Sequence, residues 1–220
     1  MRSGILVAAL LVSLSAIPAQ ASIIAYYGDI VQVSPPWSVQ EGDYENNTEI
    51  RLFAEHSPFF LPQRIRVDIT TPGLYDDELD LDPSSFVRKN TYVMTYLLHA
   101  DPVRPGTDGR EYQGRVRFGS QILGVIVVRG RLRNTDALLG AAGTLYPGSG
   151  DPSTGLELNP DQDWVELINP RTLRVHFRTH GQIDEVRVLV EAPEPGTLLL
   201  LGVALIGLGV ALRRRLRQSA

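Results

Sequence analysis

Short segments in which apolar and polar residues alternate one by one constrain the fold of this chain more than any other feature. The alternation is clearest at 64–70 and at 172–178. In the first segment, Ile65, Val67 and Ile69 face one side, and the charged residues between them, including Asp68, face the other. A period of two is the pattern of a β-strand that buries one face. The sequence therefore predicts strands at both places.

The other strand candidates are separated by loops rich in proline, glycine and aspartate. They lie at 23–33, 49–55, 91–99, 114–118, 122–128, 163–168 and 183–190. The alternating arginines of 129–133 are expected to continue the strand before them. A short helix is expected to start at Asn134 or Thr135, because either side chain is a suitable N-cap. Many short strands and little helix predict an all-β fold, an antiparallel, jelly-roll-like β-sandwich over residues 22–190.

The first 21 residues have the organisation of a secretory signal peptide. Arg2 supplies a positive charge, 4–17 is apolar, and Ala19 and Ala21 fit the small-x-small pattern of a cleavage site. We therefore predict export, with cleavage after Ala21. A first transmembrane helix is the alternative, and the shortness of the apolar stretch disfavours it.

The C-terminal end, 191–217, contains three features in a fixed order. Pro193, Glu194 and Pro195 come first, an uncharged apolar run fills 197–212, and the arginines that follow are Arg213, Arg214, Arg215 and Arg217. As a transmembrane helix the run would be about 24 Å long, which spans a bilayer if the arginines reach the interface. The arginines favour a cytoplasmic C-terminus. The two prolines keep the tripeptide before the run extended and accessible to a protease.

This arrangement resembles the PEP-CTERM sorting signal of Gram-negative bacteria. In that family a membrane enzyme, the exosortase, recognises the Pro-Glu-Pro motif, removes the span and releases the protein or transfers it to the cell surface. Ala192 stands where valine is common in the family. The resemblance implies an exosortase as partner and a single-pass intermediate in the inner membrane, with its C-terminus in the cytoplasm. It also implies a final place at the cell surface or in an extracellular matrix that contains exopolysaccharide. A permanent single-pass anchor with a proline spacer is the alternative.

Charge and cysteine content exclude several functions for the body. The whole chain has a net charge of −4. Residues 22–192, which exclude Arg2, the four tail arginines and Glu194, carry a net charge of −8. An acidic body does not suit nucleic acid. Because the chain has no cysteine, disulfides, thiol catalysis and cysteine-based metal sites are excluded.

One acidic loop has the residue types of a calcium site. Asp76, Glu78, Asp80 and Asp82 alternate over seven residues, and calcium prefers closely spaced carboxylate oxygens. Pro83 stands where a calcium loop usually has glycine, so a solvated acidic loop is the alternative. No cofactor is expected apart from this calcium. A sparser acidic set, Asp151, Asp161 and Asp163, is a weaker candidate of the same kind.

No catalytic motif is present, and the chain is expected not to be an enzyme. His176 and His180 are four residues apart on a strand and its turn, so a surface pair is expected rather than a zinc site. Trp164 is expected in the core, whereas Trp37, in a proline-rich loop, is the better candidate for stacking on sugar rings. The sequence thus predicts an exported structural protein that an exosortase sorts and cleaves. The alternative is a carbohydrate-binding module that its C-terminal helix anchors permanently.

Overall fold

The computed structural model describes residues 23–103, 109–148, 154–179 and 182–192, together with 202, 205 and 206. The chain divides into two compact units, Gln20–Glu194 and a second unit that combines Met1–Ala19 with Pro195–Ala220. All the strands below belong to the first unit. In the second unit the described residues are helical.

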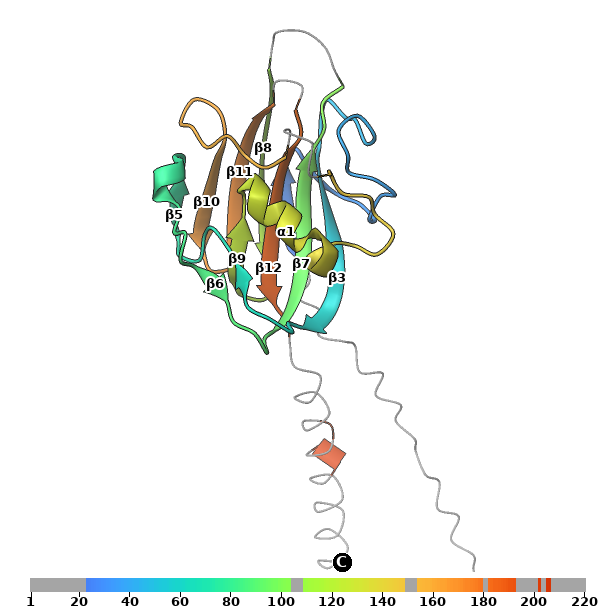
Figure 1. Ribbon diagram of the computed structural model, residues 1–220, viewed down its shortest axis with the longest axis vertical. Coiled ribbons are helices and arrows are strands. Elements are labelled where there is room, and N and C mark those ends of the chain that lie inside the picture. Colours follow the sequence, from blue (N-terminus) through green and yellow to red (C-terminus); the bar gives the residue numbers. More distant parts are fainter. Residues whose placement is uncertain are drawn as a thin grey trace, which may run out of the picture. The chain divides into compact units, whose positions relative to one another are not determined.

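Two five-stranded sheets form the body (Figure 1). The first sheet has the order β1-β8-β11-β10-β5, and all its neighbouring strands are antiparallel. The second has the order β2-β3-β7-β12-β9 and is antiparallel except for the pair β2 and β3. The strands of the first sheet are β1 (Ile23–Gly28), β5 (Gly73–Tyr75), β8 (Arg110–Phe118), β10 (Trp164–Asn169) and β11 (Thr172–Thr179). Those of the second are β2 (Ile30–Gln32), β3 (Ile50–Phe60), β7 (Tyr92–Ala100), β9 (Ile122–Ile126) and β12 (Asp184–Glu191).

The sheets face each other across one hydrophobic core. Val116 and Val175 enter this core from the first sheet, and Leu52, Leu98 and Val188 enter it from the second. All five are completely buried. Alternate residues of β8 and β10 point inward, as a period of two requires. The predicted all-β class is confirmed, and its strands at 49–55, 91–99, 114–118, 122–128, 163–168, 172–178 and 183–190 coincide with strands of the structure.

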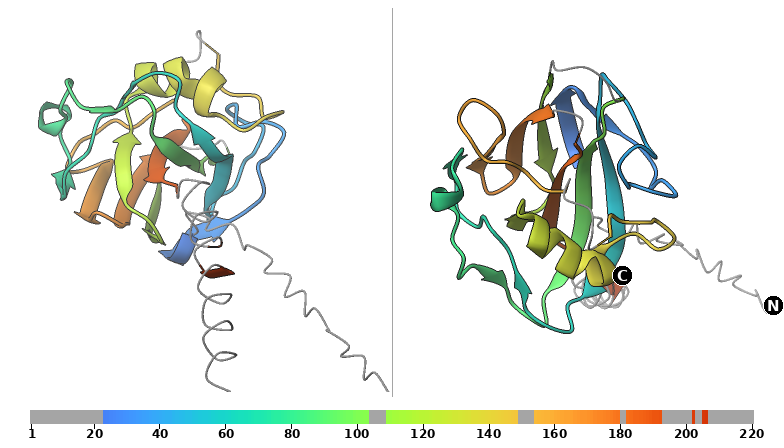
Figure 2. Two further views of the ribbon diagram at one scale, coloured as in Figure 1. Left: turned by 90° about the horizontal axis from the view of Figure 1, so that it is seen from below. Right: turned by 45° about the horizontal axis from the view of Figure 1, so that its top comes forward.

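One helix covers the outer face of the second sheet. It is α1 (Arg129–Leu139), and Figure 2 shows it on the side of that sheet that faces away from the first. Leu132 and Leu139 pack there against Val93 and Leu189. The expectation that 129–133 extends a strand was wrong. The buried residues Leu132, Thr135 and Leu139 recur at helical spacing, which favours a helix from Arg129 onward.

The segment 64–70 corrects a second expectation. Only Ile65–Arg66 forms a strand, β4, which pairs with β6 (Phe86–Val87). Asp68 was expected to face solvent but is completely buried. Its carboxylate accepts the N–H groups of Val127 and Val128, at 2.7 and 3.0 Å, and pairs with Arg131. Asp68 thereby fixes the start of α1 from a distant part of the chain.

The predicted strand 23–33 is broken in two at a change of sheet. β1 pairs with β8 in the first sheet, whereas Ile30 of β2 lies opposite Ile50 in the second. Gly28, at the junction, has a φ of 75°, a backbone angle that residues other than glycine rarely adopt. One glycine therefore lets the chain pass between the two sheets.

Trp164 is not in the core. It is half-buried on the outward face of β10, while Val165 and Leu167 point inward. Its ring stacks on His176 at 5.3 Å between centroids, and the guanidinium of Arg174 lies 4.8 Å from the indole centroid. The alternation of β10 was thus predicted correctly, but its inward face was assigned one residue too early.

Candidate functional site

The last strand runs directly into the C-terminal tail. The N–H of Glu191, the final residue of β12, donates to the carbonyl of Gln121 at 2.8 Å. The N–H of Ala192 donates to Tyr92 at 3.0 Å, and Ala192 is 4% exposed and belongs to the main core. Ala192, the last residue of the body that the structure describes, therefore still belongs to the core, and the Pro-Glu-Pro motif follows it directly in the sequence.

The sorting-tail predictions fall outside the described residues. This holds for Pro193, Glu194 and Pro195, for Ala19 and Ala21 at the predicted signal cleavage site, and for the tail arginines Arg213, Arg214, Arg215 and Arg217. Of the predicted span 197–212, the structure describes Gly202, Leu205 and Ile206. No helix in the described part of the chain is long and apolar enough to cross a bilayer.

The predicted calcium loop uses some of its carboxylates to close its own turns. Residues Glu78–Asp80 form a 3₁₀ turn, η1, in which Asp77 accepts the N–H of Leu79 at 2.9 Å. Asp82 accepts hydrogen bonds from Ser84 and Ser85, which lower the pKa of its carboxyl.

No three of Asp76, Glu78, Asp80 and Asp82 bring their carboxylate oxygens within 4.8 Å of one another in the described structure. The local geometry gives calcium no ready-made site on this loop. Calcium binding there stays a prediction.

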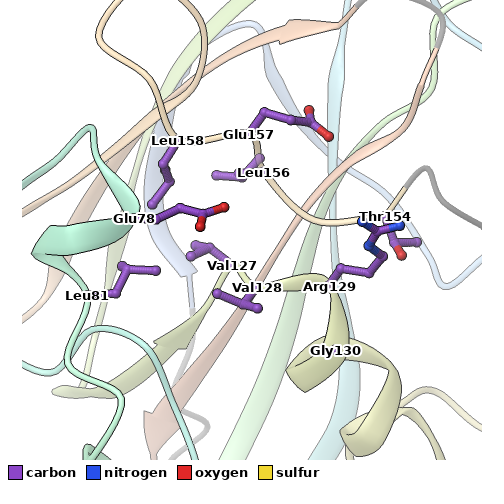
Figure 3. A pocket seen from close by; sticks show the side chains of 10 residues that line it. All are labelled: Glu78, Leu81, Val127, Val128, Arg129, Gly130, Thr154, Leu156, Glu157 and Leu158. Atoms are coloured by element: carbon purple, nitrogen blue, oxygen red, sulfur yellow. The ribbon is translucent and has the colours of Figure 1, made fainter.

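A small cavity lies beside this loop, with a volume of about 210 Å³ (Figure 3). Leucine and valine supply half of the residues that line it, and its charged residues are Glu78, Arg129 and Glu157. Pockets that hold small organic ligands usually measure about 300–1,000 Å³. This cavity therefore suits water or an ion better than a metabolite.

Next to the cavity the structure brings together three acidic residues that no local sequence pattern indicates as a set. Glu157, Asp163 and Asp184 each place a carboxylate oxygen within 4.8 Å of the other two, and Asp163 and Asp184 are buried. Asp163 was a weak candidate in combination with Asp151 and Asp161, of which 151 lies outside the described residues and Asp161 is exposed. Asp184 joins the group only because β12 and β10 begin at the same end of the body, and no local sequence pattern predicts that these two strand ends lie close together.

Of the two histidines expected to form a surface pair, the structure describes only His176. His176 stacks on Trp164, and its Nδ1 donates to the carbonyl of Gln162 at 2.7 Å, since a carbonyl only accepts. His180 lies outside the described residues. Trp37, the candidate for sugar stacking, is 63% exposed.

Comparison with known proteins identifies one part of the chain. A family model described as the PEP-CTERM protein-sorting motif matches residues 191–215. No curated protein and no solved structure matches the chain. The match begins at the last residue of β12, so the motif and the folded body meet without a gap.

Proposed function

We propose that this PEP-CTERM sorting domain-containing protein is an exported, jelly-roll-like β-sandwich whose tail an exosortase cleaves at Pro193–Pro195. Before cleavage, a signal peptide ending at Ala21 directs export, and the span 197–212 holds the chain in the inner membrane. After cleavage, the body remains at the cell surface or in an exopolysaccharide matrix. The sorting signal itself, at 191–215, is what the family match establishes.

The observation that carries the proposal is where the core ends. Val188 and Val190 of β12 are completely buried, and Ala192 is the last core residue in the part of the body that the structure describes. A cut at the Pro-Glu-Pro motif leaves β12 with all its pairings to β7 and β9. The body would therefore leave the membrane with its core complete.

A structural role for the body is supported by the use of its buried charges. The guanidinium of Arg187 bonds Glu55 and Asp136, and the buried carboxylate of Asp68 holds the start of α1. The Arg187 and Asp68 charges thus hold elements of the fold together. Together with the small volume of the cavity, this favours a non-catalytic body.

The test of sorting compares two nearby sets of residues. The variant Pro193→Ala/Glu194→Ala/Pro195→Ala should stay in the membrane fraction with its tail intact, because the exosortase loses its recognition motif. Gln182→Ala is the control, since it removes an exposed polar side chain that lies before the matched residues 191–215. Processing of the triple variant at the wild-type rate, measured by the ratio of released to membrane-bound protein, would contradict the proposal.

A carbohydrate-binding body is the second candidate, and the exposure of Trp37 favours it. Stacking on a sugar ring would change the fluorescence of Trp37 when purified exopolysaccharide is added. Trp37→Ala should abolish that change, while the emission of Trp164 remains as an internal control. An unchanged spectrum of the wild-type protein leaves the structural role as the better account.

A further inference from the structure

We propose that Glu157, Asp163 and Asp184 bind one calcium ion at the end of the sandwich where β10 and β12 begin. Glu157 lies in the loop before β10, Asp163 immediately precedes β10, and Asp184 is the first residue of β12. Because β10 belongs to the first sheet and β12 to the second, the ion would join the two sheets. This inference does not depend on how the tail is sorted.

The spacing of the carboxylates fits calcium. Their ligand oxygens lie within 4.8 Å of one another. Calcium binds oxygen at roughly 2.3–2.6 Å, so oxygens on opposite sides of the ion are about 5 Å apart. For magnesium the corresponding separation is about 4 Å, and magnesium keeps most of its waters. One calcium ion can therefore contact all three carboxylates without a large rearrangement.

Asp184 has a buried carboxylate oxygen that points to a missing ligand. The residue is 1% exposed, and its Oδ2 has no hydrogen-bond partner among the described residues. Burial beside Asp163, Glu157 and Glu185 raises the pKa of the Asp184 carboxyl well above its usual range. A buried carboxylate in such a place must be neutralised, either by a proton or by a cation.

Asp163 is held ready to act as a ligand. It is completely buried, its Oδ1 accepts the N–H of Arg178 at 2.7 Å, and its Oδ2 accepts the N–H of Glu157 at 3.0 Å. These bonds fix the orientation of the carboxylate, and a carboxylate oxygen that accepts one hydrogen bond can also bind a metal ion. The same bonds hold the Glu157 loop against β11, which places the third ligand.

Glu157 gives the site access to solvent. Its side chain is exposed, unlike those of the other two ligands. Three carboxylates offer at most six oxygens, and calcium takes six to eight, so water entering beside Glu157 completes the shell. Sites of this kind in extracellular proteins bind calcium with Kd values of about 10⁻⁴–10⁻³ M.

The experiment uses the full-length chain in detergent, with calcium and terbium as probes. Calcium at about 100 times its Kd should raise the melting temperature by about 5–10 °C over the value in EDTA. Terbium should show luminescence sensitised by Trp164, the neighbour of Asp163. No calcium-dependent shift and no terbium signal in the wild-type protein would overturn the proposal.

Variants locate the ion. Glu157→Gln should weaken terbium binding roughly ten- to a hundredfold, and it should fold because the side chain is exposed. Asp161→Asn is the matched control, since it removes an exposed carboxylate from the same loop and should bind as the wild type does. Wild-type affinity in Glu157→Gln overturns the proposal, and loss of the calcium effect in Asp80→Asn would place the ion on the 76–82 loop instead.

Discussion

Arg187 and Glu55 are joined by two hydrogen bonds of 2.7 Å each, although 132 residues separate them in the sequence. Neither side chain is more than 1% exposed. The same guanidinium donates to the carbonyl of Leu132, to Thr135 and to Asp136, at 2.9, 2.7 and 2.8 Å. One cation of β12 thus holds both β3 and α1, and its partners raise the pKa of Arg187.

Breaking this pair should be costly. Glu55→Ala leaves Arg187 buried without its main partner, so the free energy of unfolding should fall by about 3–5 kcal/mol. The double variant Glu55→Leu/Arg187→Met should recover much of that loss, because neither charge of the Arg187–Glu55 pair then stays buried without its partner. Urea denaturation followed by circular dichroism measures both values.

A second ion pair provides the control for this prediction. Arg174 and Glu166 are also 2.7 Å apart, but their side chains are 42% and 28% exposed. Removing Glu166 should cost less than about 1 kcal/mol, because water screens the pair. Equal losses for Glu55→Ala and Glu166→Ala would show that burial does not set the strength of the Arg187 pair.

Asp136 predicts a pH dependence. Desolvation by burial raises the pKa of its carboxyl from 3.8 to about 6, and the opposing attraction of Arg187 is smaller, since Arg187 is already paired with Glu55. The folded state therefore holds a proton that the unfolded state releases. The resulting stabilisation is complete below pH 3.8 and is lost as the pH rises through 6.

The variant Asp136→Asn isolates this contribution. Relative to the variant, the wild-type protein should lose about 2–3 kcal/mol of unfolding free energy between pH 4 and pH 7. Both proteins are measured by urea denaturation at each pH, so that other titrating groups cancel. A constant difference across this range would contradict the raised pKa.

Gly28 should resist substitution where Gly42 tolerates it. Both have positive φ, 75° and 84°. A Cβ on Gly28 would lie 2.2 Å from the carbonyl oxygen of Gln113, whereas one on Gly42 would meet nothing within 4 Å. Gly42→Ala should cost about 1 kcal/mol for its backbone conformation alone, and Gly28→Ala should cost clearly more. Similar melting temperatures for the two variants would contradict this account of the change of sheet.

The end of the core predicts where truncation is tolerated. A chain ending at Ala192 should melt at the temperature of the processed protein, because every described core residue is present. A chain ending at Val188 loses the buried residues Leu189 and Val190 and should not fold. Thermal melts of the two chains, each starting at Ser22, check this prediction, and a folded shorter chain would contradict it.

Sequence patterns predicted the strands well where one face of each strand meets the core. They failed where contacts with residues distant in the sequence determine whether a side chain is buried. Asp68 fits the polar face of a strand, yet it is buried because Val127 and Val128 need an acceptor at the start of α1. For α1 itself a pattern was available, since Leu132, Thr135 and Leu139 have helical spacing, but the alternating arginines obscured it.

The candidate sites divide in the same way. The sorting motif is contiguous in the sequence, so its residues could be recognised without a structure. The group of Glu157, Asp163 and Asp184 exists only after two sheets have packed together. Acidic density favoured the 76–82 loop instead, although density does not determine which way carboxylates point.

Cleavage of the tail can be measured by the intact mass of the mature protein, taken from both the membrane and the medium. We expect loss of residues 1–21 together with a new C-terminus within Pro193–Pro195, and any added mass would identify what the protein is joined to. A chain found only in membranes, with its C-terminus still at Ala220, would contradict this expectation and make the protein a permanently anchored one.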